Sequence, residues 1–139
     1  MANGRSSSKA RKVRRRYFGA PSHVVHRQFT VPVSGTETKM MGLRRAALRA
    51  GDRVVIDRGQ GLEGNYAEKD TKVKDVQGKV LRVDYKRRLV FIEDLKERKR
   101  GNKVADRPID PRNLTIIAFD LTDPKRKAKL EKLNAQALE

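Results

Sequence analysis

The apolar residues of this chain gather in short runs that turn-forming residues separate. The runs are GDRVVIDRG (51–59), GKVLRVDY (78–85), LVFIEDL (89–95) and NLTIIAFDL (113–121). Each has the length of a β-strand, and no long helical pattern lies between them. The pattern predicts a mainly β chain in which residues 47–121 form a small closed barrel. Because the strands are few and short, an SH3-like barrel is favoured over an OB-fold.

The run at 78–85 and the residues after it predict a β-hairpin. Strict alternation would place side chains on two opposite faces, namely Val80, Arg82 and Asp84 on one and Leu81, Val83 and Tyr85 on the other. The three cations at 86–88 then form a tight, exposed turn before the antiparallel partner at 89–95. Residues 96–103, KERKRGNK, are expected to form a second basic loop with five cations.

The N-terminal region has no such runs. Residues 1–16 hold a single β-branched apolar residue, so free in solution they are expected to be disordered. Pro21 and Pro32 forbid a long helix across residues 17–33. We therefore expect residues 1–33 to be a basic arm that is extended and docks at a few apolar points.

Two segments connect the arm and the strands. Residues 34–46 are predicted to be a connector with a short helix over 34–41, which Ser34 or Thr36 can cap and Gly42 can end. An 18-residue insertion, 60–77, lies between the first two strands and is long for a loop in a compact domain. Such loops are often functional or mobile.

The C-terminal segment, residues 122–139, has the pattern of a helix. Asp123 is the expected N-cap, and Pro124 takes the first helical position. Leu130 and Leu133 form a narrow apolar stripe among lysines. Such a helix needs a surface on which to dock.

Charge changes the picture more than any single motif. The chain has 139 residues, with 34 Lys and Arg against 17 Asp and Glu, so its formal net charge is +17 and its pI is about 10.7. Eight of the cations precede the first carboxylate, Glu37. An excess of this size opposes compaction unless a polyanion neutralises it. Nucleic acid is the favoured partner, and an anionic membrane surface is the second.

Composition argues against several other classes. The chain lacks Trp, has 5% aromatic residues, and contains no apolar run near the roughly 18 residues of a spanning helix, so we expect no membrane partner. Cysteine is absent, which excludes disulfides, Cys-based zinc sites and thiol nucleophiles.

No catalytic group stands out either. His23 and His26 are three residues apart, but no acid lies nearby to complete a metal site. We expect them to contact phosphates or base edges, or simply to be exposed. Four carboxylates near strand ends, Asp52, Asp57, Glu93 and Asp94, are expected to pair with neighbouring Arg53, Arg58 and Lys96. GQGLEG lacks the Lys-Ser/Thr ending of a phosphate loop. We expect no enzyme, cofactor, metal or small-molecule substrate.

The segment RKVRRRYFGAPSH (11–23) carries the best signal for RNA. Arginine offers a planar fork for phosphate oxygens and can stack on bases, and the two aromatics after the arginines add stacking faces. We expect Arg14, Arg15 and Arg16 to lie on phosphates, and Tyr17 and Phe18 to stack or pack. A solvated tail and a cleaved transit peptide are the alternatives.

These motifs resemble a known family. GDRVVIDRG and QGKVLRVDYKRRLVFIEDL resemble the KOW motif, which transcription elongation factors also carry. RKVRRRYFGAPSH, VPVSGTETKMMGLRRAALRAGDRV, RPIDPRNLTIIAFDL and DPKRKAKLEKL are similar, in order, to segments of the KOW ribosomal protein family of the large subunit, in its eukaryotic and archaeal form. That family is number twenty-four in universal naming and twenty-six in eukaryotic naming. The resemblance spans about residues 9–133, with Asp110 where the family usually has His.

The resemblance implies a structural protein on large-subunit ribosomal RNA, with neighbouring ribosomal proteins as further partners. It implies binding early in assembly, a place near the nascent-chain tunnel exit, and a cytoplasmic location with nucleolar passage if the source is eukaryotic. The loop after residue 59 departs from the family in length and reads Glu63-Gly64, so RNA contact there is in question. A KOW transcription-elongation accessory module is the alternative. The expected RNA-binding residues are Arg11, Lys12, Arg14, Arg15, Arg16, Tyr17, Phe18, Ser22, His23, His26, Arg27, Arg58, Gly59, Gly78, Lys79, Lys86, Arg87, Arg88, Lys99 and Arg100.

Overall fold

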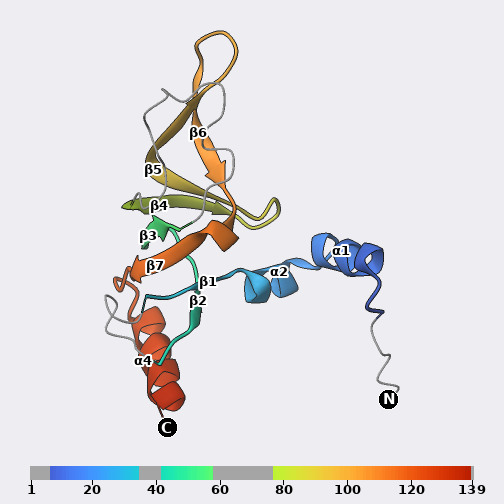
Figure 1. The fold of residues 1–139 in the computed structure, drawn as a ribbon. Helices are drawn as coiled ribbons and strands as arrows, with labels where there is room; N and C mark the ends of the chain where they lie inside the picture. Colours follow the sequence, from blue (N-terminus) through green and yellow to red (C-terminus); the bar gives the residue numbers. More distant parts are fainter. Residues whose placement is uncertain (1–6, 35–41, 58–76, 139) are drawn as a thin grey trace.

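The computed structural model describes residues 7–34, 42–57 and 77–138, and the fold is mainly β (Figure 1). The described helices are α1 (Ala10–Phe18), α2 (Ser22–Gln28), the short 3-10 helix η1 (Pro111–Asn113) and α4 (Pro124–Leu138). The described strands are β1 (Thr30–Pro32), β2 (Arg45–Ala47), β3 (Arg53–Ile56), β4 (Gln77–Asp84), β5 (Leu89–Arg98), β6 (Val104–Ile109) and β7 (Leu114–Ala118).

The strands form two antiparallel sheets, consistent with a small barrel-like fold. One sheet has the order β6-β5-β4-β3-β7, and the other pairs β1 with β2. A parallel bridge between Val33 and Ile116 joins the end of β1 to β7. The four predicted strands are confirmed as β3, β4, β5 and β7. The pattern did not predict β1, β2 or β6, because three- to six-residue strands with mixed polarity carry a weak periodic signal.

A single core lies between the sheets and holds them together. Both sheets and the helix α4 contribute fully or nearly fully buried apolar side chains. Each fully buried Val, Leu, Ile or Phe side chain contributes about 1.5–3 kcal/mol relative to leaving it exposed. The core residues are Phe29, Val31, Leu43, Ala46, Leu48, Val54, Ile56, Val80, Val90, Ile92, Ile109, Leu114, Ile116 and Leu130.

A β-bulge in β4 changes which residues face the core. Val80 lies opposite Ile92, whereas Arg82, two residues on, lies opposite the adjacent Phe91, so β4 carries one extra residue. Val80 is buried, and the extra residue, Leu81, is 48% exposed. After the bulge Val83 packs on the core, and Tyr85 does so too. The predicted strict alternation is therefore wrong at this point.

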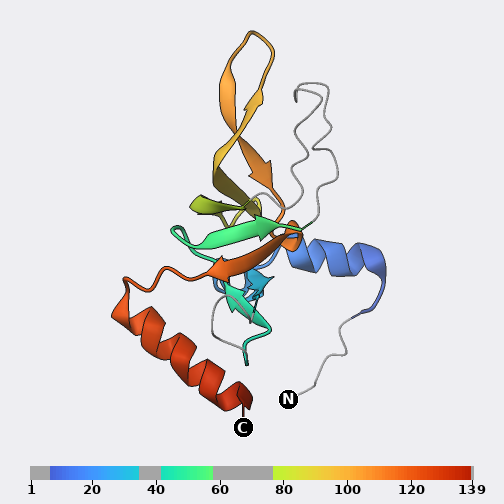
Figure 2. The ribbon, with the colours of Figure 1, turned by 60° about the vertical axis from the view of Figure 1, so that its left-hand side comes forward.

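The N-terminal region is helical over residues 10–18 and 22–28, so the expectation of an extended arm is wrong there. Arg, Lys and Ala are good helix formers, and α1 contains no Gly or Pro. The break between α1 and α2 falls at residues 19–21, where Pro21 stands just before α2. A long helix is prevented, as predicted, but two short helices replace the extended chain. In the views of Figures 1 and 2, α1 lies to the right of the sheets and α4 lies below them.

The predicted basic loop 96–103 is shorter than expected, because its first three residues belong to β5. β5 runs to Arg98 and β6 begins at Val104, so the loop is a tight turn closed by the Lys99 amide, which donates to the Lys103 carbonyl at 2.8 Å. Gly101 and Asn102 take left-handed conformations in this turn. The hairpin projects from the rest of the fold (Figure 1).

The C-terminal helix is confirmed with its predicted start. The Asp123 carboxylate accepts a hydrogen bond from the Lys125 amide at 2.9 Å, as an N-cap does. Leu130 is buried, and Leu133 is 41% exposed. At the far end of the helix, the Gly42 amide donates to the side chain of Asn134 at 3.0 Å.

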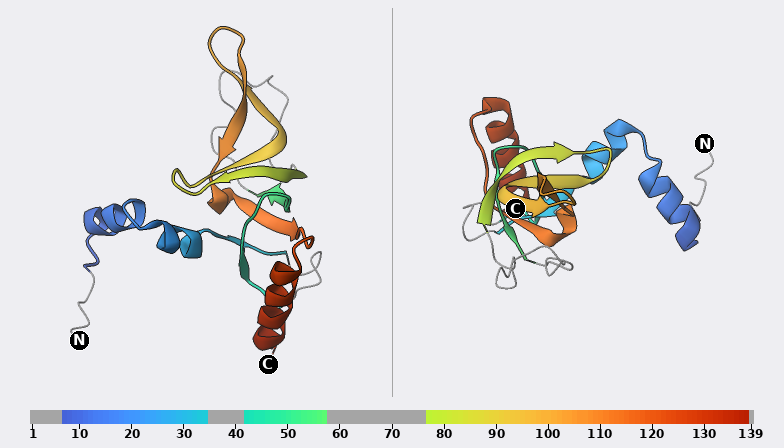
Figure 3. Two further views of the ribbon diagram at one scale, coloured as in Figure 1. Left: turned by 180° about the vertical axis from the view of Figure 1, so that it is seen from behind. Right: turned by 90° about the horizontal axis from the view of Figure 1, so that it is seen from above.

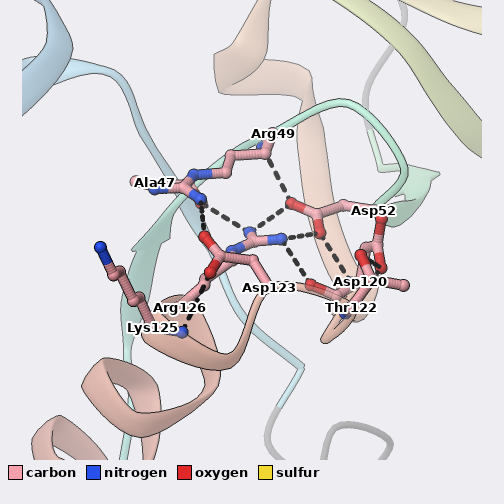
Figure 4. A network of polar contacts seen from close by, with 8 residues as sticks. All are labelled: Ala47, Arg49, Asp52, Asp120, Thr122, Asp123, Lys125 and Arg126. Carbon is pink, nitrogen blue, oxygen red and sulfur yellow. Dashed lines mark hydrogen bonds and ion pairs between the residues drawn. The ribbon is translucent and has the colours of Figure 1, made fainter.

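A buried ion pair fixes α4 to the sheets (Figure 4). The Arg126 guanidinium donates to both carboxylate oxygens of Asp52, at 2.6 and 2.7 Å, and to the carbonyls of Asp120 and Ala47. The amides of Arg49 and Asp120 donate to the same carboxylate, each at 2.9 Å. The expectation that Asp52 pairs with its neighbour Arg53 is therefore wrong, because tertiary packing supplies a buried, bidentate partner.

Some predicted features lie outside the described residues. These are the helix over 35–41, nearly all of the insertion 60–77, and the Arg58-Gly59 pair. No helix in the described part of the chain combines the length and apolar character that crossing a membrane requires.

Candidate nucleic-acid interface

The helix α1 is a basic surface with no role in the core. None of its residues is buried, and no acidic residue stands in its first turn. Arg15 and Arg16 lie in the last turn, where cations interact favourably with the helix dipole. An isolated helix of this length is marginal in water, and like charges along it repel. The exposed cations of α1 are Arg11, Lys12, Arg14, Arg15 and Arg16.

Arg88 joins α1 to the sheets. It occupies the β4–β5 turn in the left-handed region, with φ 57°, and is only 6% exposed. Its guanidinium donates to the Tyr17 carbonyl at 2.6 Å and to the Gln28 side chain at 3.0 Å. Its carbon Cζ lies 3.5 Å from the centroid of the Tyr17 ring, within cation–π range. The prediction of three exposed cations in this turn is therefore wrong for Arg88, which anchors both N-terminal helices.

The other residues of the turn are exposed beside this anchor. Lys86 and Arg87 are both exposed, and the Arg87 amide donates to the Asp84 carboxylate at 3.0 Å, which fixes the turn. Phe18 is 70% exposed and meets Tyr17 edge-on, with ring centroids 5.1 Å apart. The sequence-predicted cations of α1 and of the turn are thus brought together, with one aromatic face open to solvent.

The helix α2 docks on the same turn through rings. His26 lies 3.9 Å from Tyr85, and Phe29 lies 5.1 Å from it, between centroids. Ser22, His23 and Arg27, which the sequence also marked, are exposed on α2. Among the described residues, no group of three or more His, Cys, Asp and Glu side chains could hold a metal ion.

Sequence reasoning missed Arg112, an exposed cation on η1. Its guanidinium and amide donate to the Asp110 carboxylate at 2.9–3.1 Å. The Arg112 hydrogen bond holds the pKa of Asp110 below its usual value, and Asp110 raises the pKa of Arg112 in turn. Tyr17 adds a small contribution to that increase in the pKa of Arg112. The Asp-Pro-Arg sequence is a local turn signal that could have indicated this pair.

The remaining predicted residues lie elsewhere. Lys99 and Arg100 are exposed in the β5–β6 turn. Gly78 and Lys79 stand at the start of β4, which the eight-residue strand separates from the β4–β5 turn by about 20 Å. A Cβ on Gly78 would overlap Ile92, so this glycine has a packing role between β4 and β5. The structure does not bring these two residues to α1.

Two of the carboxylates near strand ends have side-chain partners in the described part of the chain. Asp52 is held by Arg126, and Asp57 accepts a hydrogen bond from the Thr115 hydroxyl. Glu93 is exposed, and it lines a depression that also contains Lys79. The contacts of Asp52 and Asp57 support structural roles for these two residues.

Comparison with known proteins places the chain in a family. A family model that describes the ribosomal proteins L26 of eukaryotes and L24 of archaea matches residues 7–133. Two similar proteins are each named large ribosomal subunit protein uL24. The one from Haloarcula marismortui is 32% identical over 123 residues, covering 88% of this chain and 90% of that protein. The one from Methanocella arvoryzae is 34% identical over 127 residues, covering 91% and 93%. The chain therefore belongs to the uL24 family of large ribosomal subunit proteins.

Proposed function

We propose that this protein is a non-catalytic structural constituent of the large ribosomal subunit and binds large-subunit ribosomal RNA. Membership of the uL24 family over residues 7–133 carries the proposal. The geometry supports it, because α1 exposes five cations and contains no buried residue. A helix of this kind is available to bind a partner outside the chain. Seen from above (Figure 3), α1 extends away from the sheets.

The proposed organisation follows the resemblance to the KOW family. Residues 1–33 act as a basic RNA-binding arm, residues 34–46 connect it to an SH3-like KOW barrel over 47–121, and residues 122–139 form the closing helix. Arg88 holds the arm in place, so the phosphate-binding cations reach RNA from a pre-organised position. Arginine forks on α1 match phosphate oxygens, and these contacts neutralise part of the net charge of +17.

The same family supports finer proposals about place and partners. The protein binds early in subunit assembly, contacts neighbouring ribosomal proteins, and lies near the nascent-chain tunnel exit. Its place of action is then the ribosome, with nucleolar passage if the source is eukaryotic.

Salt dependence of RNA binding tests the proposal. The triple variant Arg14→Ala, Arg15→Ala, Arg16→Ala removes up to three cations that face phosphates. The slope of log affinity against log salt should fall by about 0.7–0.9 for each phosphate that is no longer neutralised. A matched variant, Lys127→Ala, Lys129→Ala, Lys132→Ala, removes three exposed charges from α4 and should change the slope less.

Sedimentation of the tagged protein gives the second readout. The protein should migrate with large subunits at moderate salt. An unchanged slope in the α1 variant would contradict RNA binding by the arm. Co-purification with RNA polymerase in place of large subunits would contradict the ribosomal function and support the transcription-elongation alternative.

A further inference from the structure

The outer face of the five-stranded sheet carries an apolar row. The strand registers place Arg82 of β4 opposite Phe91 of β5, and Phe91 opposite Pro108 of β6. Leu89 lies two residues before Phe91, on the same face of β5. Val104, also on β6, is 58% exposed. The core-facing residues of β5 lie on the opposite face of the sheet. Packing in the core therefore does not explain why these apolar side chains lie on the outer face.

The row forms the floor of a groove of about 570 Å³ with a basic rim. Arg82, Arg87, Lys96 and Lys99 stand around the floor. Among the lining side chains that the structure describes, the one carboxylate is Asp106, which lies opposite Lys96 in the ladder. A groove of this size is within the range of pockets that hold small ligands, about 300–1,000 Å³. The four cations around the groove favour an anionic ligand.

The position of Arg82 indicates which anion. Its carbon Cζ lies 3.9 Å from the centroid of the Phe91 ring, so the guanidinium lies over the ring within cation–π range. Arg82 is exposed, so the outer face of the guanidinium is open to a further planar group. A nucleobase can stack on the guanidinium while the neighbouring phosphates reach the cations of the rim. A carboxylate side chain has no aromatic ring with which to stack.

We propose that this groove binds an unpaired nucleotide in a single-stranded segment of RNA. The base stacks on the Arg82–Phe91 pair, and the flanking phosphates lie on Arg87, Lys96 and Lys99. A duplex keeps its bases stacked inside and presents phosphates, so it would gain nothing from the apolar floor. The inference rests on the proposed RNA-binding function. It adds that the RNA recognised by this face of the sheet is single-stranded.

Two conservative variants of the full-length protein test the stack. Arg82→Lys keeps the charge but removes the planar group, and Phe91→Leu keeps apolar area but removes the ring. The probe is a short single-stranded RNA with a central fluorescent adenine analogue, compared with its duplex. Single-strand affinity should fall about 5- to 100-fold in each variant, and the stacking signal should disappear. Duplex affinity should change by less than about 2-fold.

Arg53→Lys is the matched control, an exposed strand arginine outside the groove, and should leave single-strand affinity unchanged. Equal unfolding temperatures confirm that the variants fold. Single-strand affinity equal to that of the parent, or equal losses for single strand and duplex, would overturn the inference. Competition by polyglutamate that the two variants abolish would also overturn it, in favour of an acidic peptide.

The inference and the proposed function can fail separately. A changed salt slope in the α1 variant, with parental behaviour in Arg82→Lys and Phe91→Leu, would leave the proposed function standing and remove the groove. Loss of large-subunit sedimentation by the parent protein would remove the proposed function itself.

Discussion

Replacing Arg126 by Met tests the ion pair that holds α4. The substitution preserves much of the aliphatic stem but removes two charge-assisted hydrogen bonds, both to a carboxylate that is fully buried. The Asp52 carboxylate would keep only its two backbone amide donors, from Arg49 and Asp120. Its negative charge would then lie in the interior without a counter-charge.

The expected loss is large for a chain of this size. Removing one partner of a buried pair costs about 3–5 kcal/mol, because the remaining charge has been taken out of water. Small domains have a total free energy of unfolding of about 5–15 kcal/mol. With roughly 3–4 °C per kcal/mol, the unfolding temperature should fall by about 10–20 °C.

Urea unfolding and thermal melting measure the loss. The control is Arg49→Met, which breaks the exposed pair between Arg49 and Asp123 and should cost no more than about 1 kcal/mol. A loss in Arg126→Met as small as that in the control would refute the reasoning. It would mean that the carboxylate regains solvent or another donor when the guanidinium is removed.

Three further predictions concern single side chains or backbone positions. Arg88→Met should release α1 and speed tryptic cleavage within residues 11–16 by about 10-fold or more, because each charge-assisted hydrogen bond that is lost contributes about 1.5–3 kcal/mol. An unchanged cleavage rate would contradict the anchoring role of Arg88. Arg112→Met should raise the pKa of Asp110 toward 3.8, measured by NMR titration. In the parent protein the pKa of Asp110 is lower in the folded state than in the unfolded state. The ion pair therefore stabilises the fold fully above the unfolded pKa, and this contribution is lost as pH falls through the folded pKa. Without the ion pair, acid unfolding of the variant should begin at higher pH. Gly51→Ala should cost about 1–3 kcal/mol in urea unfolding, because φ is 96° there and a Cβ would overlap a neighbouring carboxylate.

The sequence by itself determined the features that local signals encode. Short apolar runs between turn residues predicted β3, β4, β5 and β7, because the length of a strand and the turns that bound it depend on residues adjacent in the sequence. Asp123 followed by Pro124 predicted the start of α4 for the same reason. The acid-free N-terminus and the basic turns predicted a polyanion partner, since net charge does not depend on folding.

Only the tertiary structure decided what depends on residues distant in the chain. Asp52 and Arg126 are 74 residues apart, and Arg88 and Tyr17 are 71 apart. No local pattern distinguished Arg88, which is buried, from its exposed neighbour Arg87. The bulge at Leu81 likewise arises from the pairing of β4 with β5, and it leaves the Arg82 guanidinium over the Phe91 ring, outside the core. Burial and partner choice are set by which surfaces meet in three dimensions, so residues of one type in one turn acquire different roles.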